Sequence, residues 1–153
     1  MQLKLIIAGL LAALAAAAPA GASGGRAPIS IDMKGVITSY EPGVSATVEG
    51  TWAATRLITD SGTYKEWVRF DGSKLYAVKV LVSPLGVIVL GVQTVVETSA
   101  TGVMTFKGGS WRVVYGLGAY SDLEAGGRPA TTPDSAVVGA DIHVTHVGRG
   151  END

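Results

Sequence analysis

The two histidines, His143 and His146, are the side chains best suited to bind a metal ion or to move a proton. They stand three positions apart in a segment typical of a β-strand, where positions three apart point to opposite faces. They therefore cannot ligate one ion together, and we predict no metal site. Asp141, His143 and Thr145 do share a face, and an aspartate beside a histidine can orient a general base. Because no nucleophile lies near them, the favoured interpretation is a solvated polar face on the last strand.

Alternating residues on two earlier predicted strands supply a second set of candidates. The shared faces hold Trp52, Ala54, Arg56 and Ile58 on one strand and Tyr64, Glu66, Val68 and Phe70 on the next. If both faces line the inside of a closed sheet, Arg56 and Glu66 are buried, and a buried charge needs a partner. We therefore predict an Arg56–Glu66 pair in a ligand pocket lined by Trp52 and Tyr64. The alternative is that one or both charged groups reach the rim. No catalytic residue is assigned.

Other motifs and the composition exclude several classes of function. Gly116-Leu117-Gly118 resembles the start of a dinucleotide-binding loop, but Ser121 replaces the third glycine and no helix is predicted after it. We therefore predict no cofactor. The 12 Lys and Arg residues nearly balance the 13 Asp and Glu residues, so no basic surface for nucleic acid is expected. Cysteine is absent, which excludes disulfides, a thiol nucleophile and thiolate metal sites.

The elements that must position these residues are predicted to be β-strands. Val, Ile, Trp and Tyr dominate the apolar positions, Gly, Pro, Asp and Ser clusters interrupt them, and no useful length shows helical periodicity. The eight predicted strands are residues 29–38, 45–58, 63–70, 74–82, 87–98, 103–107, 110–116 and 136–147. Asp71-Gly72 and Gly108-Gly109 are predicted hairpin turns, and Pro84-Leu85-Gly86 is predicted to turn the longest apolar stretch. Successive strands should pair antiparallel, with residues 128–134 as a long loop.

The N-terminus predicts export. A short basic start, an apolar run over residues 5–18 and the small residues 18–22 form a signal peptide, with cleavage after Ala20 or Ala22. The apolar run of about 14 residues is shorter than the ~20 that cross a bilayer. The predicted divisions are a signal peptide (1–22), a flexible lead (23–28), a barrel domain (29–148) and a polar tail (149–153). The mature protein is expected to be secreted, extracellular or periplasmic, and free of the membrane.

Two membrane interpretations of the mature part are less favoured. Residues 75–96 are strongly apolar, but Lys79, Pro84 and many β-branched residues indicate a buried hairpin rather than a spanning helix. An eight-stranded outer-membrane barrel fits the strand number. Such barrels carry aromatic girdles at both rims, whereas the aromatic residues here are scattered and the C-terminal tail is polar.

The segment 109–127 resembles a family of small barrels. Its G-x-G-x-Y-x-x-L pattern, formed by Gly116, Gly118, Tyr120 and Leu123, is similar to the late-strand signature of the allene oxide cyclase and dirigent-like barrels, which include secreted bacterial members of unknown function. A vaguer similarity covers residues 55–72, and Asp122 departs from the usual pattern. The resemblance implies an eight-stranded antiparallel β-barrel, in agreement with the strand count, and Tyr120 and Leu123 are expected to fold back as plugs.

Three functions remain open at this point. The first is a secreted barrel that binds a small apolar or aromatic molecule in its lumen. The second is an inert structural or interaction module of the cell exterior, with self-association through an apolar patch. The third is a shape-driven enzyme of the cyclase or dirigent kind, an isomerase-like activity with proton transfer. The absence of a spaced catalytic cluster disfavours the enzyme.

Overall fold

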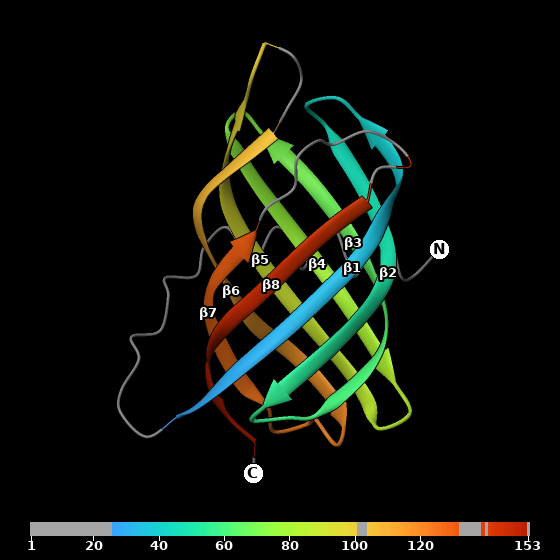
Figure 1. Ribbon diagram of the computed structural model, residues 1–153, viewed down its shortest axis with the longest axis vertical. Helices are drawn as coiled ribbons and strands as arrows, with labels where there is room; N and C mark the ends of the chain where they lie inside the picture. Colours follow the sequence, from blue (N-terminus) through green and yellow to red (C-terminus); the bar gives the residue numbers. More distant parts are fainter. Residues whose placement is uncertain (1–25, 101–103, 132–138, 140, 153) are drawn as a thin grey trace.

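In the computed structural model the chain forms a closed antiparallel β-barrel of eight strands, which confirms the predicted fold class (Figure 1). The structure describes residues 26–100, 104–131, 139 and 141–152. The strands are β1 (Ala27–Glu41), β2 (Ser45–Arg56), β3 (Asp60–Asp71), β4 (Lys74–Ser83), β5 (Gly86–Thr98), β6 (Met104–Gly118), β7 (Glu124–Thr131) and β8 (Asp141–Glu151). Each strand pairs with the next, and β1 pairs with β8 to close the sheet.

Alternation of side chains gives the barrel an apolar interior. On β1 the buried residues are Ile29, Ile31, Met33 and Ile37, and they join one core cluster with the inward residues of the other strands. Charged side chains such as Lys34, Glu49 and Lys65 alternate with the core and are exposed. An eight-stranded barrel is just wide enough to be filled by side chains or to hold one small ligand.

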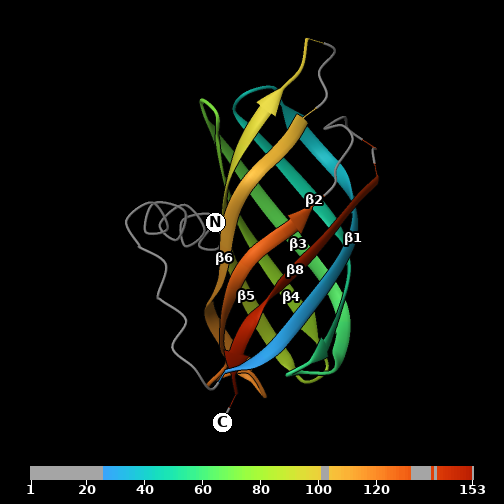
Figure 2. The same cartoon turned by 60° about the vertical axis from the view of Figure 1, so that its left-hand side comes forward.

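The prediction for β6 was wrong in one respect, because Gly108-Gly109 is a bulge and not a hairpin turn. The residues before and after it pair with the same strand, Lys107 with Val95 and Ser110 with Gln93, so the two predicted strands are one. Both glycines have positive φ, 70° and 134°, which lets the extra residues bend the strand without breaking it. Figure 2 shows β6 as one long curved strand.

The segment after residue 123 also differs from the prediction. β7 (Glu124–Thr131) includes residues expected to lie in a loop, and it pairs with β8 along its whole length. Its pairing with β6 covers only Trp111–Gly127 and Arg112–Gly126. A proline lacks the N–H that a central strand donates, which is why this segment reads as a loop in sequence. The predicted number of eight strands is therefore right. The predicted strands 103–107 and 110–116 belong to the single strand β6, however, and β7 was not predicted.

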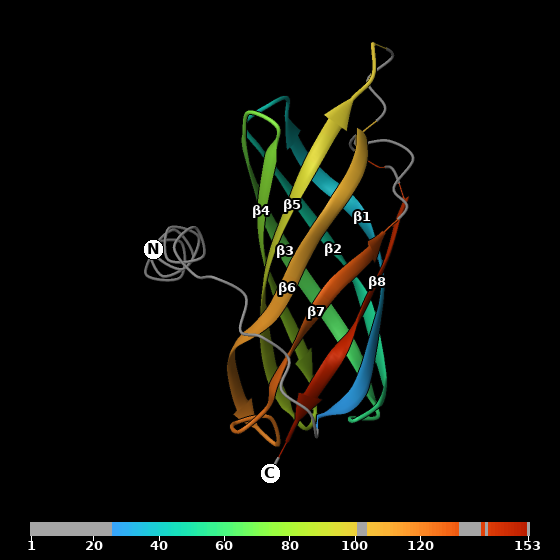
Figure 3. The same cartoon turned by 90° about the vertical axis from the view of Figure 1, so that its left-hand side faces the viewer.

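The turn between β6 and β7 lies at the lower end of the barrel in Figure 1. Tyr120 and Leu123 fold back into the core, as predicted, and both are buried. A Cβ atom at Gly116 would lie 1.8 Å from the Tyr120 carbonyl oxygen, so glycine is required for this close return. At the opposite end the inward residues Phe70 and Phe106 are only partly buried, and Figure 3 shows β5 reaching past its neighbours there.

The ends of the described chain modify the predicted divisions. β1 begins at Ala27 and β8 continues to Glu151, so part of the predicted lead and part of the polar tail belong to the sheet. The predicted signal peptide (1–22) lies outside the described residues. Over the ranges that the structure describes, no helix has the length and apolarity needed to span a bilayer.

Candidate functional site

Four polar side chains lie inside the apolar barrel and define what we call the lumen cluster: Tyr64, Glu66, Lys79 and His146. Their exposed fractions are 4%, 7%, 3% and 0%. They come from β3, β4 and β8, each from an inward position of its strand. Polar groups removed from water in this way are costly unless they find hydrogen-bond or ionic partners.

Glu66 and Lys79 satisfy each other as a buried ion pair. They are directly opposite in the register of β3 and β4, and the Lys79 Nζ lies 3.2 Å from the Glu66 Oε2. The predicted partner of Glu66 was Arg56, and that pairing was wrong. Lys79 takes its place because the neighbouring strand presents it at the same height in the lumen.

His146 is the most deeply buried member of the cluster. Neither its Nδ1 nor its Nε2 has a hydrogen-bond partner among the described residues. Burial, together with the positive charge of Lys79, lowers the pKa of His146 well below its ordinary value, so the imidazole is neutral at pH 7. A neutral imidazole has one N–H donor and one acceptor nitrogen. Each buried group left unpaired costs about 1–3 kcal/mol.

Trp111 packs beside His146 and fixes one side of it. The two ring centroids are 5.6 Å apart at an interplanar angle of 35°. The Trp111 indole N–H donates to the Val147 carbonyl at 3.1 Å, which anchors the indole to β8. The imidazole is therefore held against an aromatic wall while its own nitrogens stay free.

Tyr64 extends the cluster along β3. Burial, and then the negative charge of Glu66, raises the pKa of Tyr64, so its hydroxyl stays protonated. A Cβ atom at Gly35 would lie 2.4 Å from the Tyr64 hydroxyl oxygen, so glycine at this position makes room for the phenol.

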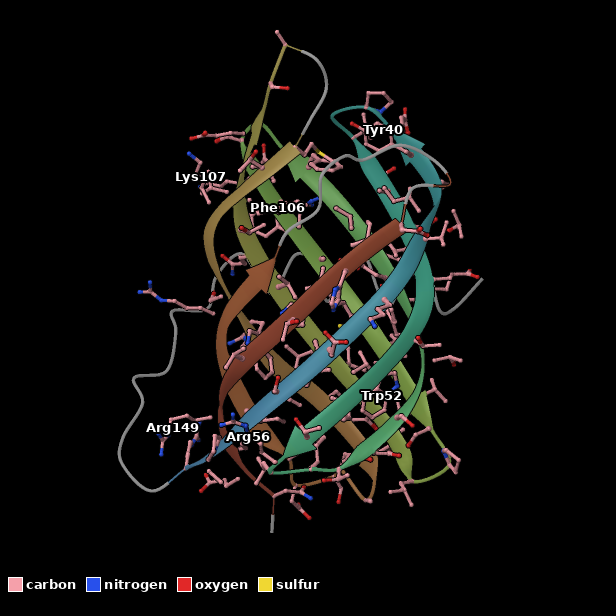
Figure 4. All side chains as sticks on the ribbon, viewed as in Figure 1. Tyr40, Trp52, Arg56, Phe106, Lys107 and Arg149 are labelled. Atoms are coloured by element: carbon pink, nitrogen blue, oxygen red, sulfur yellow. The ribbon has the colours of Figure 1, made fainter. Side chains whose placement is uncertain are left out.

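Trp52 and Arg56, the other two predicted pocket residues, do not belong to the lumen cluster. Trp52 is buried in the core, and its indole N–H donates to the Val82 carbonyl at 3.3 Å. Arg56 is exposed at the lower end of the barrel (Figure 4). The prediction that Arg56 enters the lumen was wrong, because the chain turns there with a φ of 82° and leaves the alternation of β2.

His143 lies on the outer face, opposite to His146, as the spacing predicts. Its Nε2 is 2.5 Å from Asp32 Oδ1, and the Thr145 hydroxyl donates to the same oxygen at 2.9 Å. Partial burial acts to raise the pKa of Asp32, but the hydrogen bonds from His143 and Thr145 outweigh it and lower that pKa. The side chain of His143 is 55% exposed and that of Asp32 is 41% exposed, which fits a solvated polar face rather than a catalytic pair.

Within the lumen cluster, the unfilled hydrogen-bonding groups shown among the described residues are the two ring nitrogens of His146. The described residues include no group of three or more His, Asp and Glu side chains placed to hold a metal ion. Sequence reasoning found Tyr64 and Glu66 but missed Lys79 and His146 as members. The available signal was alternation along β8, which places His146 on the same face as Val144, a buried residue. Comparison of this chain with protein-family models, curated proteins and solved structures found no match.

Proposed function

We propose that this protein is an exported barrel that binds a small apolar or aromatic molecule in its lumen. The observation that carries the proposal is the pair of buried imidazole nitrogens of His146 without partners. Buried polar groups in proteins are nearly always hydrogen-bonded, and exceptions call for a role or a partner. Lumen residues around the cluster are apolar, so a mainly apolar molecule with one polar group complements the site.

The route of entry is proposed at the upper end. At the lower end, the side chains of Tyr120 and Leu123 form a buried plug. At the upper end, the inward side chains of Phe70 and Phe106 are only partly buried. A molecule entering past Phe70 and Phe106 meets apolar side chains first and the lumen cluster further in. The apolar part of the molecule therefore leaves water before its polar group reaches the lumen cluster, and this sequence of events is favourable.

Native mass spectrometry of protein recovered from culture medium tests the proposal. A bound molecule should add mass under gentle conditions and be lost on denaturation. The His146→Phe variant removes the unpaired nitrogens without removing ring volume, so it is the specific comparison. The Tyr120→Ala variant loosens the lower plug and is less specific. Apo protein alone, together with failure of apolar aromatic probes to bind it in solution, would contradict the proposal.

A second candidate function, self-association, is favoured by the outer face of β4, β5 and β6. One part of this face is an apolar patch made of Val78, Val80, Val82, Val87, Val89, Tyr115 and Leu117, of which Val78 and Val89 are buried, while the charged residues Lys74, Glu97, Lys107 and Arg112 lie on the same three strands outside the patch. Among them Val82, Tyr115 and Leu117 are about half exposed. Because the exposed residues of the patch carry no charge that would select a charged partner, a second copy presenting the same patch is the occupant we favour. Stable interfaces need roughly 20–30 residues on each side, so this smaller face predicts a weak dimer.

Sedimentation measured over a range of concentrations tests self-association. The Leu117→Lys variant should remain a monomer where the unaltered barrel dimerises. Thr51→Lys, on the exposed outer face of β2, is the matched control and should leave association unchanged. A monomer at all concentrations would remove this candidate.

A further inference from the structure

The charges inside the barrel cancel, which restricts what can bind there. Besides tyrosines and tryptophans, the buried polar and charged residues among those described are Glu66, Lys79, Thr94 and His146. Thr94 donates its hydroxyl to the Gly108 carbonyl and so is already satisfied. Glu66 and Lys79 form the ion pair at 3.2 Å. Among the described residues, the lumen therefore holds one negative and one positive group, which are paired with each other.

A charged molecule in the lumen would break this balance. A carboxylate would either remain unpaired or compete with Glu66 for Lys79, leaving one negative charge without a counter-charge. Uncompensated buried charges cost several kcal/mol, even after local relaxation. A cation faces the same difficulty at Glu66. The electrostatics of the lumen thus favour a molecule with no formal charge.

The unfilled hydrogen-bonding positions describe the polar group that such a molecule should carry. His146 has an acceptor nitrogen that needs a donor and an N–H that needs an acceptor. A hydroxyl group both donates and accepts, whereas a hydrocarbon does neither and a carbonyl only accepts.

We infer that the lumen selects an uncharged, apolar-bodied molecule bearing a hydroxyl group, and that His146 is the residue that recognises this hydroxyl. The inference rests on the proposed function and adds the ligand class and the recognising residue. Trp111, held against the imidazole, is a positioning residue, since it keeps the imidazole in place without offering a free polar atom.

Three probes that share one ring system test the inference: naphthalene, 2-naphthol and 2-naphthoate. Binding to the mature protein is measured at pH 7 by calorimetry or by probe fluorescence. We expect 2-naphthol to bind about tenfold more tightly than naphthalene, since one recovered buried hydrogen bond has about that effect. 2-Naphthoate, which is ionised at this pH, should bind more weakly than both.

Variants at the two histidines assign the effect to one residue. His146→Phe should abolish the preference for 2-naphthol over naphthalene while retaining naphthalene binding. His146→Gln, whose amide both donates and accepts hydrogen bonds, should restore part of the preference. His143→Phe, on the outer face of the same strand, is the matched control and should behave as the unaltered protein.

The outcomes separate this inference from the proposed function. If all three probes bind equally, if 2-naphthoate binds most tightly, or if His146→Phe keeps the preference, the inference is overturned and lumen binding stands. If none of the probes binds, both are overturned. Should His146→Phe fail to fold, the His146→Gln variant and the order of the three probes on the unaltered protein still decide the question.

Discussion

Removing Lys79 should destabilise the barrel far more than removing a lysine from its surface. The Lys79→Met variant keeps the aliphatic stem but takes away the ammonium, which leaves the buried Glu66 carboxylate without its partner at 3.2 Å. Breaking a buried pair in this way costs about 3–5 kcal/mol. For a domain of this size that corresponds to a fall in Tm of roughly 10–20 °C.

The neighbouring strands offer a matched control. Lys65 on β3 pairs with Glu49 on β2 at 2.5 Å, but these side chains are 47% and 51% exposed. Surface pairs are worth about 0–1 kcal/mol, so Lys65→Met should change the free energy of unfolding little. Urea unfolding followed by circular dichroism measures both variants under the same conditions.

The double variant Glu66→Leu/Lys79→Met separates the cost of the lost partner from any defect in packing. Replacing a buried pair by apolar residues of similar volume is often neutral or stabilising, so the double variant should regain most of the lost stability. If Lys79→Met is no more harmful than Lys65→Met, or if the double variant is as unstable as Lys79→Met alone, the account of a buried, mutually satisfied pair is refuted.

Three further predictions follow from the polar groups of the interior. Because the pKa of His146 is lowered in the folded state, the unfolded state binds more protons below about pH 6.5, and the free energy of unfolding should fall by up to about 1.4 kcal/mol per pH unit there. Urea unfolding at pH 7 and pH 5 should show this loss, which His146→Phe should remove. Burial and then the Asp60 carboxylate raise the pKa of Tyr120 to about 12, so its phenolate should appear in an ultraviolet titration well above its ordinary pH, and Tyr120→Phe should cost about 1–2 kcal/mol in thermal unfolding. Gly35→Ala should cost about 1–3 kcal/mol because its Cβ would lie 2.4 Å from the Tyr64 hydroxyl, and adding Tyr64→Phe should recover part of that loss by the same measurement.

The architecture could be predicted because its signals are local. Alternation of apolar and polar residues along 63–70 identifies Tyr64 and Glu66 as inward residues, and both are buried. The plug of Tyr120 and Leu123 follows from glycines that permit a tight return. The Gly108-Gly109 pair was misleading because two glycines with positive φ suit a bulge as well as a hairpin turn, and only pairing with β5 distinguishes the two.

The candidate site was harder to predict, because its members meet only through the closed sheet. Lys79 stands in a strand that is apolar on both faces, with Ala77 and Leu81 inside and Val78 and Val80 outside, so periodicity could not say which way it points. Arg56 lies on the inward face by alternation, but the turn at that residue ends the alternation. No local pattern indicates that His146 and Lys79, from β8 and β4, belong to one site.

The most direct test of lumen binding at His146 is nitrogen NMR of the two imidazoles in protein labelled at histidine. We predict a neutral His146 at pH 7 whose ring nitrogens shift when 2-naphthol is added, while the ring nitrogens of the exposed His143 do not. A His146 that is charged at pH 7, or whose nitrogens are unaffected while the probe binds, would contradict the account.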